Sequence, residues 1–380
     1  MRLPTGATHL KPRRGGIMER IPFFLHTFVN MLRRLWQKTA FKIGVIAAGV
    51  IAVPAMLGYL ITPDNTRDCN RIIPELANKP PGFTFSYLLA GKPLSSSFLD
   101  YFTGAPSEGT AIPCRVTGQN KDSIFYIPFA ETNPLSIAKN RLIADKDGHF
   151  EYQQTALLGT DRFGRDMLSR LIIGARVSLL VGLVSVVISL FIGTLIGMAA
   201  GFYGGRTDSI LSWLISVFWS IPTLLIALGL SFAFGKGLWQ VLLATGLSTW
   251  VEVARVVRGQ TLQLRQKEFI LSSIITGFSP FYIMRKHILP NLKGTLTVMA
   301  TTNFAAAILL ESGLSFLGLG LAPPTPSWGM MVKEHLGNLV LDNAYLALVP
   351  GLAIMALVMA FNLMSMGLRD ALDTRISSTS

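Results

Sequence analysis

The sequence predicts an all-α polytopic membrane protein with six transmembrane helices and a long extracytoplasmic insertion between the first and the second. Half of its 380 residues are hydrophobic and only 14% are charged, whereas soluble domains carry about 25% charged residues. Four runs without a charged residue are long enough for the ~20 residues that a helical span requires. These runs are residues 43–63, 177–205, 209–235 and 343–368.

Two further spans are predicted from shorter uncharged runs, residues 237–251 and 294–310. Each run is followed by an acidic residue, Glu252 or Glu311. The runs reach a full span only if these carboxylates lie at a membrane interface or face the interior of the protein, because ionisable side chains avoid lipid. They are the fourth and fifth predicted helices.

The distribution of charge predicts how the chain crosses the membrane. The formal net charge is +13, and the excess of Lys and Arg is concentrated in residues 1–42 and 252–294, while residues 62–176 are nearly balanced. Lys and Arg beside spans mark the cytoplasmic side, and long loops translocate whatever their charge. Both termini are therefore predicted to be cytoplasmic. The basic excess is explained by topology, so no nucleic-acid partner is predicted.

The first apolar run is predicted to stay as an uncleaved span, because the charged leader before it is far longer than that of a signal peptide. The predicted domains are a cytoplasmic N-terminal segment (1–42), transmembrane helix 1 (43–63), an extracytoplasmic insertion (64–155) and a core of helices 2 to 6 (156–375).

The predicted insertion differs in composition from the rest of the chain. It carries Pro-Gly turns and strand-like segments such as residues 123–127, which predict a small, loop-rich unit. Its two cysteines, Cys69 and Cys114, are the only ones in the chain. In an oxidising compartment a disulfide between them is favoured over two free thiols, and it would stabilise the fold by roughly 3–4 kcal/mol.

The segment before the second span is predicted to form an amphipathic helix at the outer membrane interface. Thr160 or Asp161 would cap this helix. Its polar face would carry Arg165, Asp166 and Arg170, and its opposite face would be apolar.

Residues 268–290, EFILSSIITGFSPFYIMRKHILP, predict a helical hairpin between two spans, on the cytoplasmic side. Gly277 breaks its first helix, and Ser279 and Pro280 provide an N-cap and a first-turn proline. Pro290 is predicted to end the second helix, because the residue before a proline disfavours the α region.

The hairpin is too apolar for a loop that is merely solvated. A face of Phe269, Ile270, Ile274 and Ile275 can insert into a groove on a partner protein. We therefore expect that an external motor docks on this hairpin and drives conformational change in the membrane.

Other intramembrane features leave alternatives open. Glu311 either lines the outer mouth of a pathway or forms a hydrogen bond that holds the re-entrant turn after it. Prolines inside predicted spans are expected to kink them; they are Pro54, Pro222 and Pro350. Methionines of the last span are expected to fill the core, namely Met355, Met359, Met364 and Met366.

Five ordered blocks resemble the inner-membrane permease subunits of dipeptide and oligopeptide ABC importers, specifically the second of the two paired permeases. The resemblance covers about residues 156–375. The blocks are LGTDRFGRDMLSRLIIGARVSLLVG (158–182), GFYGGRTDSIL (201–211), IPTLLIAL (221–228), ESGLSFLGLGLAPPTPSWGMM (311–331) and GLRDALD (367–373). Any one block is weak evidence, but five in order around the hairpin are strong.

In this resemblance the hairpin corresponds to the EAA loop of the family. Gly277 is its glycine, and His287, Ile288, Leu289 and Pro290 provide its ending. The chain departs from the pattern at the start, where Leu271, Ser272 and Ser273 replace Glu-Ala-Ala and the nearest acid is Glu268, one turn earlier.

The resemblance implies the partners and the mechanism. It implies a multi-pass protein of the bacterial inner membrane that is not itself an enzyme. This protein would form the translocation path with a homologous permease, by alternating access. Two ABC ATPase subunits would dock at the EAA loops, and an extracytoplasmic binding protein would deliver peptides, nickel chelates or antimicrobial peptides.

The residues agree with a subunit that binds no cofactor, so that ATP and Mg²⁺ would be bound by the ATPases. The chain has no Gly-x4-Gly-Lys-Ser/Thr loop. Its five histidines show no metal-ligand spacing, which predicts no metal site. Two other classes stay open. One is a stand-alone secondary transporter or channel, which needs ion-coupling residues at mid-membrane. The other is a receptor or assembly factor that uses residues 62–155 for recognition.

Overall fold

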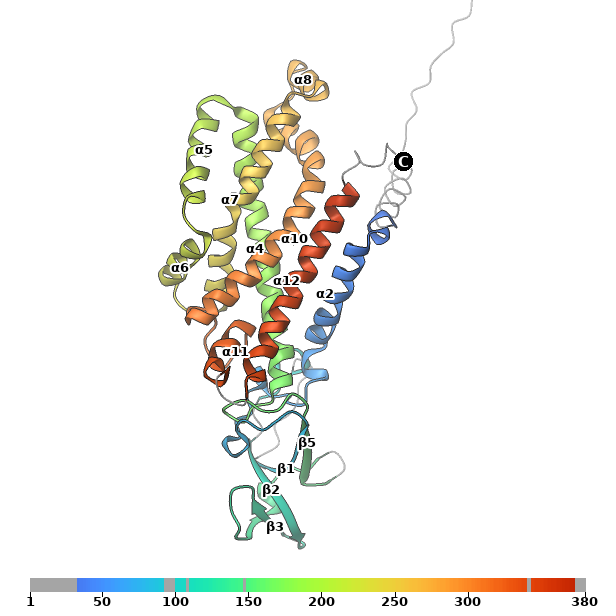
Figure 1. Ribbon diagram of the computed structural model, residues 1–380, viewed down its shortest axis with the longest axis vertical. Helices are drawn as coiled ribbons and strands as arrows, with labels where there is room; N and C mark the ends of the chain where they lie inside the picture. The colour runs from blue at the N-terminus through green and yellow to red at the C-terminus, as the bar shows by residue number, and fades with distance from the viewer. Residues whose placement is uncertain (1–32, 92–99, 107–108, 146–147, 340–342, 373–380) are drawn as a thin grey trace, which may run out of the picture.

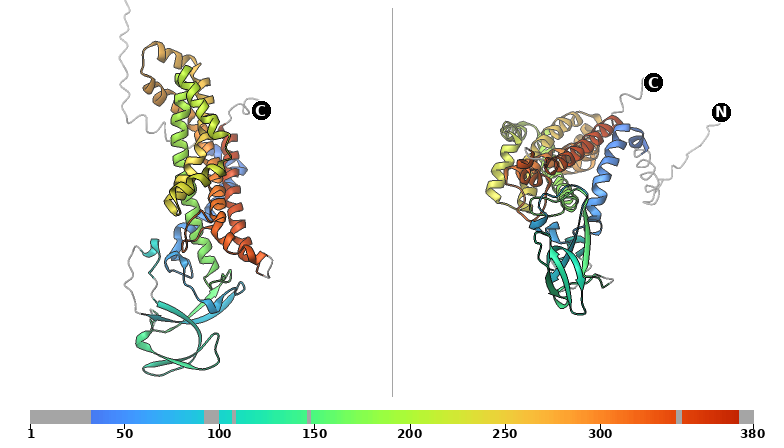
Figure 2. Two further views of the ribbon diagram at one scale, coloured as in Figure 1. Left: turned by 90° about the vertical axis from the view of Figure 1, so that its left-hand side faces the viewer. Right: turned by 60° about the horizontal axis from the view of Figure 1, so that its bottom comes forward.

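The computed structural model describes residues 33–91, 100–106, 109–145, 148–339 and 343–372. Most of the predicted N-terminal segment, residues 1–32, and the last residues of the predicted core, 373–375, lie outside the described residues. The chain forms an elongated helical bundle with a small β domain at one end (Figure 1). The turned views in Figure 2 show the same separation of the two parts.

The bundle consists of long helices joined by short connections. They are α2 (Thr39–Leu57), α4 (Met167–Tyr203), α5 (Gly205–Trp219), α6 (Thr223–Phe234), α7 (Leu238–Arg265), α8 (Glu268–Ile275), α9 (Pro280–Ile283), α10 (Leu289–Leu317), α11 (Trp328–Glu334) and α12 (Tyr345–Leu372). A 3-10 turn, η1 (Gly58–Leu60), extends α2, and the 3-10 turn η6 (Leu336–Leu339) follows α11.

Four helices among the described residues are long and apolar enough to cross a membrane. They are residues 39–60, 167–203, 280–317 and 345–372, and the pair α5 and α6 would make a fifth span. The fourth predicted span does form a helix, α7, but it falls short of this test because polar side chains occupy its second half. The count of six spans therefore stays a prediction.

The third predicted span is not one straight helix. The chain bends by 89° between α5 and α6. Pro222 lies at the N-cap of α6 with extended backbone angles, and the residue before a proline disfavours the α region. The proline therefore ends one helix and starts another, where a kink within a single helix was predicted.

Helices α4 and α7 pack closely because small residues face α7 once per turn of α4. A Cβ added at Gly193 or Gly197 would lie 2.5 Å from atoms of Val253 or Ala254, and one at Gly201 would lie 2.7 Å from Thr261. Small residues spaced by four allow helix backbones to approach closely in membrane proteins. This seam fixes α7 alongside a membrane-crossing helix despite its polar residues.

The predicted insertion is a folded β domain, so the fold is not all-α. Its antiparallel sheet has the strand order β4-β3-β2-β1-β5. The strands are β1 (Phe83–Gly91), β2 (Gly109–Gln119), β3 (Ser123–Pro128), β4 (Leu135–Ala138) and β5 (Glu151–Ala156), with the short helix α3 (Asp100–Thr103) and the 3-10 turns η2 (Arg67–Cys69), η3 (Pro74–Leu76) and η4 (Lys139–Arg141).

Both faces of the inner strand β1, which lies between β2 and β5, are buried. Tyr87 and Leu89 pack into one hydrophobic cluster and Leu88 packs into another. This alternation follows the two-residue period of a strand. A loop-rich unit was predicted because Pro and Gly mark the turns strongly, while the pairing of distant strands leaves no local signal.

The predicted disulfide is absent, because Cys69 and Cys114 are free and buried in separate clusters. Cys69 packs with Tyr59 and Ile173, and its thiol donates to the carbonyl oxygen of Asp64 at 3.1 Å. Burial raises the pKa of the Cys69 thiol, and it raises that of Cys114 to about 11. Both side chains therefore act as small apolar residues in the described fold.

The predicted amphipathic surface helix is also wrong. Asp166 caps α4 directly, since its carboxylate accepts from Ser169 N at 2.8 Å. Arg165 is buried; its guanidinium contacts Asp161 at 2.6 Å and Glu334 at 3.0 Å. Arg170 lies 3.8 Å from Asp161 and 3.7 Å from Glu334. In the sequence these charges look like the solvated face of a helix. In the structure they form a buried charge cluster, because Glu334 of the distant helix α11 pairs with Arg165 and Arg170.

Candidate functional site

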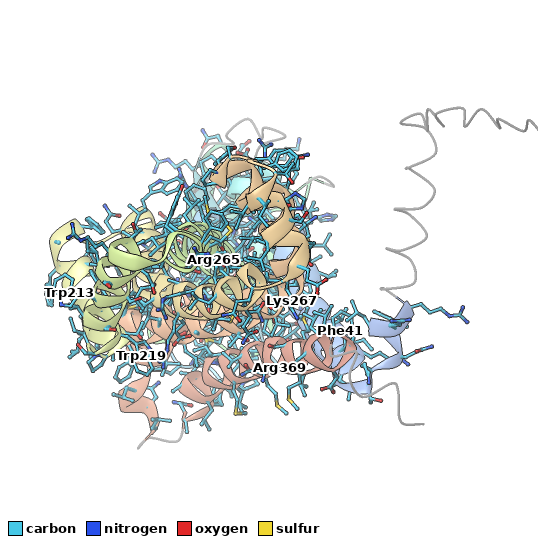
Figure 3. The ribbon with its side chains drawn as sticks, turned by 90° about the horizontal axis from the view of Figure 1, so that it is seen from above. Phe41, Trp213, Trp219, Arg265, Lys267 and Arg369 are labelled. Atoms are coloured by element: carbon cyan, nitrogen blue, oxygen red, sulfur yellow. The ribbon has the colours of Figure 1, made fainter. Side chains whose placement is uncertain are left out.

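The predicted hairpin lies at the end of the bundle opposite the β domain (Figure 1). Figure 3 looks down on this end: Arg265 and Lys267 lie where α7 passes into the hairpin, and Arg369 lies near the end of α12. The predicted helix-break-helix element is present, formed by α8, a short turn, and α9.

Gly277 ends α8 as the sequence predicts. Its φ of +83° lies in the left-handed region, which glycine adopts without the penalty of a Cβ. Phe278 N donates to Ser273 O at 3.2 Å, and Gly277 N donates to Ile274 O at 3.0 Å. These two bonds form a Schellman motif, which satisfies carbonyl groups at the helix end.

The second arm begins as predicted but does not end at Pro290. The Ser279 hydroxyl caps α9 by accepting from Tyr282 N at 3.3 Å. The chain then passes through a π-helical turn, η5 (Met284–Ile288), into α10, so that residues 280–317 form one continuous helical run. A helix-interior proline lacks an N–H and crowds the carbonyl four residues earlier. The wider π turn before Pro290 accommodates both effects.

One face of the hairpin is anchored in the bundle. Ile270, Ile283 and Ile288 are fully or almost fully buried. They share a hydrophobic cluster with residues of α4, α7 and α10, including Met198 and Val257. Ile270 is therefore an anchor of the hairpin and does not belong to a docking face as predicted. Ile270 points to the buried side of α8, while its sequence neighbours Phe269 and Leu271 are exposed.

The opposite face of the hairpin is apolar and exposed. Ile275 is 86% exposed and Phe281 is 67% exposed. Phe278 stacks on Tyr282 with ring centroids 4.9 Å apart, and the Tyr282 ring also meets the edge of His287. We call this surface the hairpin face; it comprises Phe269, Leu271, Ile274, Ile275, Phe278, Phe281 and Tyr282.

The residues that replace Glu-Ala-Ala have different environments. Leu271 and Ser272 are exposed, whereas Ser273 is buried and its hydroxyl donates to Phe269 O at 2.8 Å. Glu268 is exposed in the first turn of α8. Leu289 is partly buried against the anchored cluster. The structure brings these predicted residues together in one hairpin.

Glu311 is fully buried and does not line an open mouth in this conformation. Ser315 donates to its carboxylate at 2.7 Å, and the Ser327 hydroxyl lies 3.3 Å from that of Ser315. Ser327 is the N-cap of α11. The geometry favours the second alternative for Glu311, a hydrogen-bonded link between α10 and the turn that returns to α11.

Three of the four methionines of α12 line a surface groove and are not core filler, whereas Met364 packs against a buried cluster with Phe41 and Leu368 as predicted. Met355, Met359 and Met366 are each 59% exposed. The groove has a volume of about 650 Å³, and Leu309 of α10 and Val332 of α11 complete its wall. The sequence pattern did not reveal it, because methionine is common in both cores and binding surfaces.

Together these features define a polytopic membrane protein with an anchored hairpin whose exposed face suits a partner. Residues 193–378 match the family described as "Binding-protein-dependent transport system inner membrane component". The chain belongs to this family and is a membrane permease component of a transport system.

Several named permease proteins are similar to the chain. It is 41% identical over 218 residues to the dipeptide transport system permease protein DppC of Bacillus subtilis, a match that covers 57% of this chain and 68% of that protein. It is 36% identical over 241 residues to the glutathione transport system permease protein GsiD of Pectobacterium atrosepticum, covering 62% and 80%.

A solved structure of the MetNI methionine ABC transporter, in an inward-facing conformation, aligns with 54% of this chain and 97% of the matched chain. That alignment has 18% identity and a TM-score of 0.45. The named relatives are permeases of peptide and glutathione transport systems and give no support to a stand-alone channel or a receptor.

Proposed function

We propose that this protein is the permease subunit of an ATP-driven ABC importer for peptides or peptide-like solutes. It would form the translocation path with a homologous permease. Two ABC ATPase subunits would supply the energy, and an extracytoplasmic binding protein would deliver the substrate. The observation that carries the proposal is the two-faced hairpin, anchored on one side and apolar and exposed on the other.

The hairpin is suited to transmit force. Its second arm continues through η5 into α10 without a flexible linker. The buried Ile270 and Ile283 tie both arms to α4, α7 and α10. An ATPase that moves the hairpin face would therefore move α10 as well. This coupling supports an alternating-access cycle in which the core helices tilt around a central path.

The proposed orientation places the hairpin and both termini in the cytoplasm and the β domain outside. The Lys and Arg excess of residues 252–294 supports this side for the hairpin, and the β domain lies at the opposite end of the bundle (Figure 1). Helix α7 would be the fourth crossing and would bring the total to six, with its polar residues kept from lipid by neighbouring protein.

The groove on α12 is the surface that we assign to the homologous permease. Its exposed methionines offer an adaptable apolar wall for an irregular partner surface. Peptides are the proposed substrates because the relatives named above include dipeptide and glutathione permeases. Nickel chelates and antimicrobial peptides are alternatives within the same importer class.

The test is recovery of ATPase subunits with the tagged protein from membranes in which the whole importer is produced. Ile275→Glu places a charge at the most exposed position of the hairpin face. A docked ATPase subunit would bury the Ile275 side chain, and burial of one isoleucine stabilises a complex by about 1.5–3 kcal/mol. Loss of this contact is expected to lower ATPase recovery by at least about tenfold.

Phe125→Glu, an exposed position in the distant β domain, is the matched control and is expected to keep recovery unchanged. If the unaltered protein recovers no ATPase subunit, or Ile275→Glu recovers as much as the control, the proposal is wrong.

A further inference from the structure

A small cavity lies between α5 and α7, away from the hairpin face. Its volume is about 200 Å³, and it is lined by Ser212, Ile215, Ser216, Trp219, Arg255 and Arg258. Figure 3 shows Trp219 near the edge of the bundle, on the side of α5. Two arginines and two hydroxyl groups therefore meet in one cavity between these helices.

The two arginines differ in how their charges are compensated. Arg258 contacts the Asp208 carboxylate through Nε at 2.6 Å and Nη2 at 2.7 Å, so its charge is paired. Arg255 forms no ion pair with any residue that the structure describes, although Glu252 precedes it by one helical turn. Its guanidinium instead lies 3.9 Å from the ring centre of Trp219.

Arg255 lies at the level of the apolar part of the bundle, and it is exposed on the surface of the single subunit beside Trp219, which is 57% exposed. Gly197 of α4 packs directly against Ala254 and Val257, on either side of Arg255. At about 1.5 Å per residue, Gly197 is roughly 12 Å from the end of the uncharged run of α4 at Gly205. A charge at this depth is costly unless it faces protein or water.

The break between α5 and α6 lies on the same side. Ser220, Ile221 and Pro222 are exposed in the single subunit, and they follow Trp219 directly. Irregular backbone at membrane depth is tolerated only where protein covers it or where it borders water. Two independent features, the exposed break and the unpaired arginine, therefore favour protein or water over lipid at this face.

We propose that Arg255 and Trp219 form a carboxylate-binding station on the translocation path. This inference rests on the proposed function, because it assumes a peptide substrate that carries a carboxylate. The planar guanidinium pairs with a carboxylate through two parallel hydrogen bonds, and the Trp219 ring holds its plane. The cavity is smaller than the ~300 Å³ of sites that enclose a whole small ligand, so it contacts one end of the peptide.

The test is ATP-driven uptake into proteoliposomes that contain the whole importer, with its partner permease, ATPases and binding protein. Uptake of alanyl-alanine is compared with uptake of its C-terminal amide, each expressed relative to the unaltered protein, so that selection by the binding protein cancels. Arg255→Gln is expected to lower uptake of the free acid by about tenfold and that of the amide by less than about twofold, since the charge-assisted bond is lost only for the acid.

Further variants separate the station from general damage. Arg255→Lys keeps the charge without the planar fork and should give an intermediate loss. Arg206→Gln is the matched control, an exposed arginine on α5 outside the cavity, and should change neither uptake. Should Arg255→Gln prevent assembly, Trp219→Leu carries the same comparison between acid and amide.

Three outcomes would overturn the station. An equal loss for acid and amide would show that Arg255 only supports the fold. A loss that disappears when anionic phosphatidylglycerol is replaced by zwitterionic phosphatidylcholine would show that Arg255 acts through an anionic lipid headgroup. Absence of any peptide uptake by the unaltered importer would instead remove the proposed function itself, and the station with it.

Discussion

Replacement of Gly277 tests how the hairpin depends on a single backbone conformation. Gly277 has a φ of +83°, and an added Cβ would meet no atom within 4 Å. Any cost of a substitution therefore comes from the backbone alone. A left-handed conformation costs an L residue about 1–2 kcal/mol, and a β-branched residue is especially unsuited to it.

Gly277→Val should thus shift the hairpin away from its native turn, with loss of the bonds from Gly277 N to Ile274 O and from Phe278 N to Ser273 O. A cost of about 1–2 kcal/mol corresponds to roughly 5- to 30-fold in the population of the native turn. We expect peptide uptake to fall by that factor while the amount of protein in the membrane stays constant.

The assay is ATP-driven uptake by the assembled importer, with ATP hydrolysis measured in parallel. Gly277→Asn is the control, since asparagine tolerates the left-handed region at helix ends, and it should keep most of the uptake. Equal uptake by the Val and Asn variants would refute the reasoning, as would a Val variant whose whole bundle loses thermal stability.

Three further predictions concern stability. Glu334→Ala leaves Asp161 to pair with both buried guanidiniums, Arg165 and Arg170, and should lower the free energy of unfolding by about 3 kcal/mol; the loss of thermal stability should be smaller when the same change is made in an Arg165→Met background. Gly197→Val, which crowds Ala254 O, should reduce the amount of folded protein in membranes, whereas Gly259→Ala, in open space, should leave it unchanged. Burial lowers the pKa of His335, so its contribution to stability is present above the unfolded pKa of about 6.5 and is lost as pH falls below it; unfolding midpoints measured at falling pH should drop less in His335→Gln.

Membrane class, most of the helices and the hairpin were predictable because their signals are local. Uncharged runs and the positions of Gly277 and Ser279 act within a few residues of chain. The local preference of Pro290 predicts the end of a helix, but the helical run continues past Pro290, because a π turn before the proline accommodates it. The bend at Pro222 was misjudged for a related reason: the size of a bend depends on what packs around it.

The buried charge cluster between the β domain and the bundle could not be predicted from neighbouring residues. Asp161 and Arg165 look like one polar face of a surface helix, but Glu334 lies 169 residues beyond Arg165 in the chain. In the same way, neither the separation of Cys69 from Cys114 nor the sheet around Tyr87 has a signal in neighbouring residues. Each depends on contacts between distant segments.

Hydropathy, charge and helix-ending residues act over short distances, so the sequence alone establishes a polytopic membrane protein with a helical hairpin between two spans, and the resemblance of its ordered blocks adds that it is a permease. The folded structure was needed to show which side of the hairpin is anchored, and that Arg255 lies without an ion pair beside Trp219 at the broken helix. Burial and charge pairing are properties of the space around a side chain. They depend on segments that the chain brings together only when it folds.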